Sequence, residues 1–218
     1  MDDSRGEILD KIRRSRGWLP EAKTLAAALA SGAGNHGLTA VELAQRFALE
    51  ARKIDAEVFE DPTPEAALER LLGLLKDEHV LAWDLDHVDR GVLASASASL
   101  EFGKSSDRSR TSLGLTGCDM AIAETGSLVL VAGPGQNREA SLICRTHVAL
   151  VRPSDVVTDL AEALARVDSL GERRAHINIV SGPSRTADIE MTLTRGVHGP
   201  KRLVILVADW PRLNKGDA

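Results

Sequence analysis

The sequence predicts an α/β fold built on parallel strands, and three observations lead to this class. Short apolar runs alternate with a helical pattern between residues 56 and 83, as in a parallel βαβ unit. Other apolar runs end in segments rich in glycine and hydroxyl groups, at 117–135 and 177–200. A chain of 218 residues can bury a sizeable core, and it requires only one α/β domain.

Helical patterns dominate the first third of the chain. A short helix is expected within residues 3–16 and another over the alanine-rich run 21–30, before a glycine-rich linker at 31–37. Thr39 is placed to cap a helix whose apolar residues recur at three- and four-residue spacing up to Ile54.

The first βαβ unit follows this helix. A strand is expected over residues 56–60, and Thr63-Pro64 is a typical helix start. The next strand is expected at 79–83, so the helix between them connects parallel strands.

The second half of the chain is richer in strands. Two buried strands flank residues 124–127, which predict a tight turn because Gly126 supplies a positive φ. Ser154-Asp155 predicts the start of a helix that includes Val156 and Val157, and a further helix start is expected near Thr186. The other strands are expected at 146–151, 176–180 and 203–208.

Composition argues against nucleic acid and membranes as partners. The formal net charge is -5, from 27 basic and 32 acidic residues, without a basic stripe. Three Trp, three Phe and no Tyr leave few rings for stacking on bases. No apolar stretch reaches about 18 residues and no apolar signal region opens the chain, so a soluble cytoplasmic protein without a membrane span is expected.

No cofactor is expected from the cysteines. Cys118 and Cys144 lie inside apolar runs, which predicts reduced core residues. Two cysteines alone cannot supply the four thiolates of an ordinary iron-sulfur cluster.

No metal or dinucleotide site is expected either. The acidic residues that follow the strand at 79–83 lack the spacing of known metal ligands, so a solvated loop is favoured. These residues, with one histidine, are Asp84, Asp86, His87 and Asp89. The run 133–138 has Arg138 where the dinucleotide fingerprint requires a third small residue.

Two motifs carry a resemblance to a known family. The first is Ala121-Ile122-Ala123-Glu124-Thr125-Gly126. The second is Gly182-Pro183-Ser184-Arg185-Thr186-Ala187-Asp188-Ile189-Glu190, completed by Val197-His198-Gly199-Pro200. With these motifs in this order, the chain resembles the LUD-domain family of lactate-utilization proteins, LutC/YkgG type, over nearly its whole length. Cys118 and the segment 92–110 depart from the family pattern, and the second departure leaves the outer wall of the site undefined.

The resemblance implies a fold and a role. The implied fold is a three-layer α/β/α sandwich of the NagB/RpiA/CoA-transferase-like type, with an N-terminal helical extension at 1–37 and a LUD α/β domain at 38–218. Family members act with two iron-sulfur partner proteins in oxidising L-lactate to pyruvate. The implied role is therefore an auxiliary subunit of a cytoplasmic lactate-oxidising system.

The expected site combines both motifs, because ligands of open α/β sheets bind outside the carboxyl ends of the strands. Glu124 is the candidate catalytic residue, by analogy with the strand-end glutamate nucleophile of some CoA transferases. One cleft is expected to hold a small anionic ligand, whereas His147 and His176 are expected to be structural. The expected ligand contacts are Thr125, Gly126, Ser127, Gly133, Gly135, Gly182, Ser184, Arg185, Thr186, Asp188, Glu190 and His198.

Two other functions stay open at this stage. The chain could be a stand-alone acyl- or group-transfer enzyme with Glu124 as nucleophile or base. It could also be a non-catalytic ligand-binding scaffold with the same pocket. Glu124 itself could equally be a structural turn carboxylate.

Overall fold

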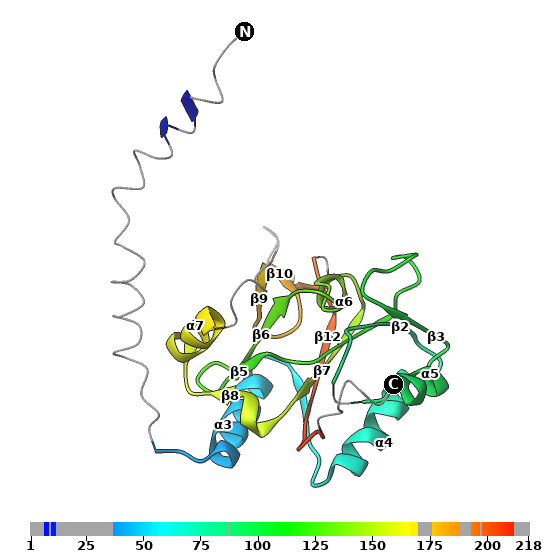
Figure 1. Ribbon diagram of the computed structural model, residues 1–218, viewed down its shortest axis with the longest axis horizontal. Helices are drawn as coiled ribbons and strands as arrows, with labels where there is room; N and C mark the ends of the chain where they lie inside the picture. The colour runs from blue at the N-terminus through cyan, green and yellow to red at the C-terminus, as the bar shows by residue number, and fades with distance from the viewer. Residues whose placement is uncertain are drawn as a thin grey trace.

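The central element of the molecule is a sheet of six strands, all parallel (Figure 1). The computed structural model describes residues 7, 8, 10, 11, 37–86, 88–169, 176–187, 193–196 and 198–211. The strands, in their spatial order, are β1 (Glu57–Glu60), β12 (Arg202–Val207), β7 (Thr146–Val151), β4 (Leu113–Thr116), β2 (His79–Ala82) and β3 (Ser99–Phe102). The predicted α/β class with parallel strands is therefore confirmed.

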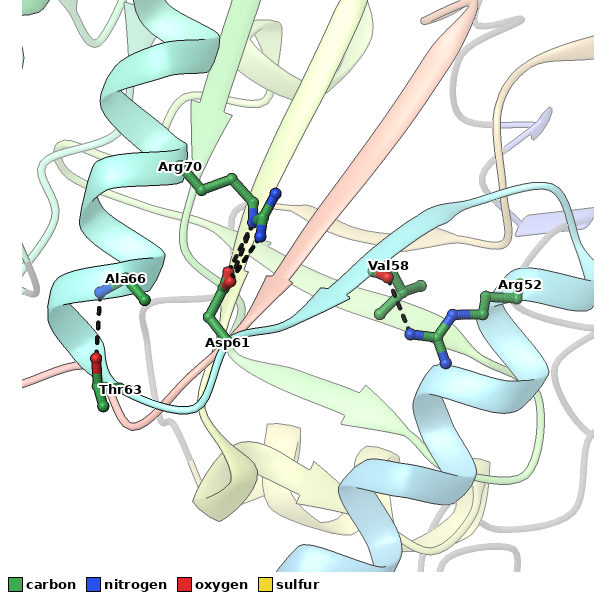
Figure 2. A network of polar contacts seen from close by, with 6 residues as sticks. All are labelled: Arg52, Val58, Asp61, Thr63, Ala66 and Arg70. Atoms are coloured by element: carbon green, nitrogen blue, oxygen red, sulfur yellow. Dashed lines mark hydrogen bonds and ion pairs between the residues drawn. The ribbon is translucent and has the colours of Figure 1, made fainter.

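The connection from β1 to β2 shows how local sequence fixes an element. Thr63 caps helix α4 (Pro64–Leu75) by accepting a hydrogen bond of 3.2 Å from the amide of Ala66, and Pro64 occupies the first turn. Asp61 receives a fork of hydrogen bonds from Arg70, which ties the start of this loop to the helix (Figure 2). The predicted helix start is confirmed.

Both faces of the central sheet are buried, because each strand sends alternate residues to opposite sides. On β7, Val148 and Leu150 pack under α4 and α5 (Arg90–Ala96). Ala149 and Val151 face the other side, where α3 (Ala40–Lys53) supplies Phe47 and other buried residues. Figure 1 shows α4 and α5 on one side of the sheet and α3 on the other.

A second, four-stranded sheet shares the α3 side, in the order β8-β5-β6-β9. Its inner face joins the core with α3, and its outer face is covered by α7 (Leu160–Ser169) through Ala163 and Val167. Its strands are β5 (Met120–Ile122), β6 (Ser127–Ala132), β8 (Val156–Val157) and β9 (His176–Val180). The chain thus adds a small sheet where a plain sandwich has only helices.

Short helix α6 (Glu139–Leu142) carries the chain back from β6 to the central sheet. It crosses β4 so closely that a Cβ on Gly114 would lie 1.6 Å from the carbonyl oxygen of Ala140. Only glycine fits at this crossing.

Two predicted helix starts are wrong. Ser154 and Asp155 lie in a 3-10 turn (Pro153–Asp155), and Val156-Val157 pairs with β5 as strand β8, as suits β-branched residues. Helix α7 begins later, where Asp159 accepts a 2.8 Å hydrogen bond from the amide of Glu162.

The second wrong helix start is at Thr186, which lies inside strand β10 (Arg185–Ala187). This strand pairs antiparallel with β11 (Leu193–Arg195) in a separate two-stranded sheet. A hydroxyl before a polar run is typical of a helix cap, but here Thr186 lies opposite Thr194 in the backbone register of this antiparallel pair.

Several predictions fall wholly or partly outside the described residues. Of the expected extension at 1–37, the structure describes five residues, 7, 8, 10, 11 and 37, and His87 is not described. Asp89, from the same acidic loop, caps α5 by accepting hydrogen bonds from the amides of Gly91 and Val92. Among the described helices, none has both the length and the apolar character needed to cross a bilayer.

His147 is buried in the centre of the sheet, where its Nε2 lies 2.9 Å from Oγ1 of Thr116 and its Nδ1 has no hydrogen-bond partner among the described residues. Burial lowers the pKa of this imidazole from 6.5 to about 4. The unfolded chain therefore binds a proton that the folded chain excludes. Stability should be fully present above about pH 6.5 and should fall, by up to about 3 kcal/mol, as pH drops through about 4.

This pH dependence can be measured by urea unfolding between pH 4 and pH 7.5. His147→Gln keeps a hydrogen-bonding group near Thr116 but does not titrate, so its stability should depend less steeply on pH. Equal slopes for the two proteins would show that His147 is not the responsible group.

Candidate functional site

The predicted turn at residues 124–127 joins β5 to β6, which pair antiparallel with Ile122 opposite Ser127. The turn is held by its backbone: the amide of Gly126 donates to the carbonyl of Ile122 (2.9 Å), and that of Glu124 donates to Thr158 (3.0 Å). Gly126 has the predicted positive φ, +68°. The side chain of Glu124 is exposed, so the turn presents a carboxylate to solvent.

Hydroxyl groups connect this turn to Ser181, the residue just before the second motif. Thr125 donates to Ser127 (2.8 Å), and the Ser127 hydroxyl lies 2.8 Å from that of Ser181. The contact follows from the pairing of β6 with β9, which sets Leu128 opposite Val180. The turn and the residue that leads into the second motif therefore lie side by side.

The end of α3 lies between the two motifs. A Cβ on Gly126 would lie 2.2 Å from the amide nitrogen of Ala51, and one on Gly182 would lie 2.3 Å from the carbonyl oxygen of Ile54. Both glycines also have positive φ, so both are required for the backbone to approach the helix.

Arg185 extends this cluster, because its guanidinium forms an ion pair of 2.6 Å with Asp55, just after α3. The loop that carries His198 lies alongside: the amide of Ser184 donates to Pro200 (2.8 Å). His198 itself is exposed. Among the remaining predicted contacts, Thr186 is described in its backbone only, while Asp188 and Glu190 lie outside the described residues.

The prediction of one cleft for all these residues is wrong, because the loop at Gly133–Gly135 lies at the opposite end of β6. At about 3.3 Å per residue, the path from Ser127 to Ala132 spans about 17 Å. Figure 1 shows β6 running from the end of α3 towards α6. The amide of Gly133 is also not open to an anion, since it donates to Gln136 within a tight turn (3.2 Å).

A cavity of about 560 Å³ opens beside this far loop. It lies beyond the carboxyl ends of β2 and β3, since Gly103 follows β3 directly and the carbonyl of Gly135 accepts from the amide of Asp84 (2.8 Å), just past β2. This is where open α/β sheets bind ligands. The lining residues are Gly103, Lys104, Ala132, Gly133, Pro134, Gly135, Gln136, Asn137, Arg138 and His176.

Sequence reasoning missed most of this cavity. Lys104 belongs to the segment that matched no pattern, and Arg138 appeared only as a departure from the dinucleotide fingerprint. His176 was expected to be a structural residue, yet it is exposed and lines the cavity. The reason is the direction of β9, which is antiparallel to β6, so that its first residue lies opposite Ala132.

Both cysteines are buried and free, as predicted for core residues. Burial raises the pKa of the Cys118 thiol well above its usual value and that of Cys144 to about 12. Each thiol also donates to a backbone carbonyl, of Met120 and Ala140 respectively. Neither is therefore a ready thiolate at neutral pH.

Comparison with known proteins identifies the family. The model of the LUD domain matches residues 44–208 of this chain. Two proteins named Lactate utilization protein C are similar over most of their length: that of Macrococcus caseolyticus is 30% identical over 79% of this chain and 80% of its own, and that of Exiguobacterium is 34% identical over 79% and 81%.

A solved structure is also similar. The crystal structure of a DUF162 family protein from Deinococcus radiodurans has 25% sequence identity and a TM-score of 0.57, covering 78% of this chain and 99% of that one. Sequence and fold agree, and the chain belongs to the LUD domain family.

Proposed function

We propose that this chain is an auxiliary subunit of a cytoplasmic system that oxidises L-lactate to pyruvate together with iron-sulfur partner proteins. The observation that carries the proposal is the similarity, over about four fifths of both chains, to proteins named Lactate utilization protein C. Two features of the described part of the chain support it. One is the Glu124 cluster, which consists of the turn at 124–127, Ser181 and Arg185 near the end of α3. The other is the cavity at the edge of the central sheet.

The proposal assigns electron transfer to the partner proteins. Cluster binding requires thiolates, and the two thiols of this chain are buried and have raised pKa values. Two free, buried cysteines also suit a reducing compartment such as the cytoplasm.

Within the chain, Glu124 is the proposed catalytic residue. Glu124 is exposed and is followed directly by the exposed Thr125, and Arg185, which is paired with Asp55, lies near the end of α3. A cation and hydroxyl donors are the groups that hold a carboxylate, and lactate and pyruvate both carry one. The motif residues from Gly182 to Glu190, together with His198, would complete this end of the site.

Deletion of the gene in the native host is expected to abolish growth on L-lactate as sole carbon source, because the partners would lack a required subunit. Growth on pyruvate should be unchanged, and the wild-type gene should restore growth on lactate. Affinity purification of the tagged chain from lactate-grown cells should recover cysteine-rich iron-sulfur proteins, identified by mass spectrometry.

Two outcomes would contradict this proposal. Normal growth of the deletion strain on lactate, in a host without a second copy of the gene, would show that the subunit is not required. Lactate turnover by the isolated chain with a soluble acceptor would show that it is an enzyme on its own.

A further inference from the structure

We propose that the cavity beyond the far end of β6 binds a small organic anion with two negative charges, a phosphomonoester or a dicarboxylate. This site is separate from the Glu124 cluster, and the inference does not depend on a role in lactate utilization. The volume of about 560 Å³ lies within the roughly 300–1,000 Å³ of small-molecule pockets.

The charges around the cavity favour an anion. Asp84 and Glu139, which contact or adjoin the lining residues, are each paired with an arginine: Asp84 with Arg90 at 2.8 Å, and Glu139 with Arg108. Lys104 and Arg138 line the cavity, and neither forms an ion pair with any residue in the described part of the chain. Two cations without an ion-pair partner among the described residues match a ligand with two negative charges.

The buried carboxylate of Glu139 links the backbone segments that carry Lys104 and Arg138, so both cations lie on the same wall of the cavity. Glu139 follows Arg138 directly and begins α6. Its Oε2 accepts a 3.3 Å hydrogen bond from the amide of Ser105, which follows Lys104. The amide of Gly103, on the other side of Lys104, donates to the carbonyl of Ala82 (3.3 Å). The backbone that carries Lys104 is therefore fixed on both sides before any ligand binds.

Neutral donors complete the lining. Oδ1 of Asn137 accepts from the amide of Glu139 (2.9 Å), so the NH₂ of this side chain is the group left for a ligand. The carbonyl of Asn137 is held by the indole of Trp83 (2.9 Å), which fixes the residue in place. His176, the first residue of β9, lines the same cavity.

The test is binding of simple probe anions to the purified full-length chain. Inorganic phosphate, malonate and L-lactate are titrated at constant ionic strength, with affinity measured by calorimetry and ligand-dependent thermal shift. Phosphate or malonate is expected to bind at least tenfold more tightly than L-lactate, which has one charge. Whichever dianion binds more tightly identifies the ligand as a phosphomonoester or a dicarboxylate.

The variants are Lys104→Ala, Arg138→Ala and the double variant, with Lys76→Ala as a control that removes one exposed cation just after α4, before β2 begins. Each single variant is expected to weaken dianion binding about tenfold, and the double variant should abolish it, whereas Lys76→Ala should bind normally. All three positions are exposed, so the unliganded melting temperature should not change. Absence of dianion binding to the wild type, equal binding of L-lactate, or normal binding by the double variant would each overturn the proposal.

Discussion

Replacing Gly114 with alanine is expected to lower the free energy of unfolding by about 4 kcal/mol or more. The new Cβ would lie 1.6 Å from the carbonyl oxygen of Ala140 and 2.8 Å from the sulfur of Cys144. Because the first contact is with backbone, α6 as a whole must move away from β4, and the well-packed core resists such a shift. Urea unfolding with far-UV circular dichroism measures the change.

Gly73→Ala is the matched control. Gly73 lies within α4, is exposed, and has no other atom within 4 Å of the position of a new Cβ. Alanine there should raise stability by about 0.5 to 1 kcal/mol, through helix propensity alone. A loss of less than about 1 kcal/mol in Gly114→Ala would mean that α6 does not cross β4 as tightly as the structure has it.

Glu124→Gln is expected to abolish complementation of the deletion strain on L-lactate while changing the free energy of unfolding by less than about 1 kcal/mol. The two effects separate because the turn is held by backbone hydrogen bonds to Ile122 and Thr158, and the carboxylate itself is exposed. Glutamine keeps the shape of the side chain but removes its charge and its ability to act as a base or nucleophile.

The control for this prediction is Glu69→Gln, which neutralises an exposed carboxylate on α4 and should complement fully. Abundance of each variant is checked by immunoblotting, so that loss of growth is not confused with loss of protein. If Glu124→Gln supports growth at the wild-type rate, Glu124 is only a turn residue.

Local chemistry allowed much of the fold to be predicted from the sequence. Thr63 and Pro64 start α4 where expected, and Gly126 has the positive φ that its turn requires. These features depend on residues close in sequence, whose propensities and capping bonds are the same in most folds. The meeting of the Glu124 turn with Ser181 was also predictable, because both follow the carboxyl ends of β5 and β9, which run in the same direction on either side of β6.

What the sequence could not supply was the direction of each strand. An apolar run has the same appearance in a parallel and an antiparallel sheet, so the neighbours of β9 were unknown and its first residue, His176, was expected to be structural. Its antiparallel pairing with β6 instead sets His176 beside the Gly133–Gly135 loop, about 17 Å from the Glu124 turn. Val156-Val157 was misassigned for a related reason, since a two-residue strand is defined by its partner β5.

The position of β12 has a consequence for the order in which the molecule can assemble. This strand is the last in sequence order among the described residues, yet it lies between β1 and β7, and Arg202 forms a forked ion pair with Glu57, 145 positions earlier. While the protein is being synthesised, β1 has no partner in the central sheet until residue 207 has left the ribosome. Once β7 is complete, at residue 151, the growing chain must carry two unpaired strand edges, those of β1 and β7, and such edges invite aggregation. A fragment that ends before residue 202 would keep those edges open permanently.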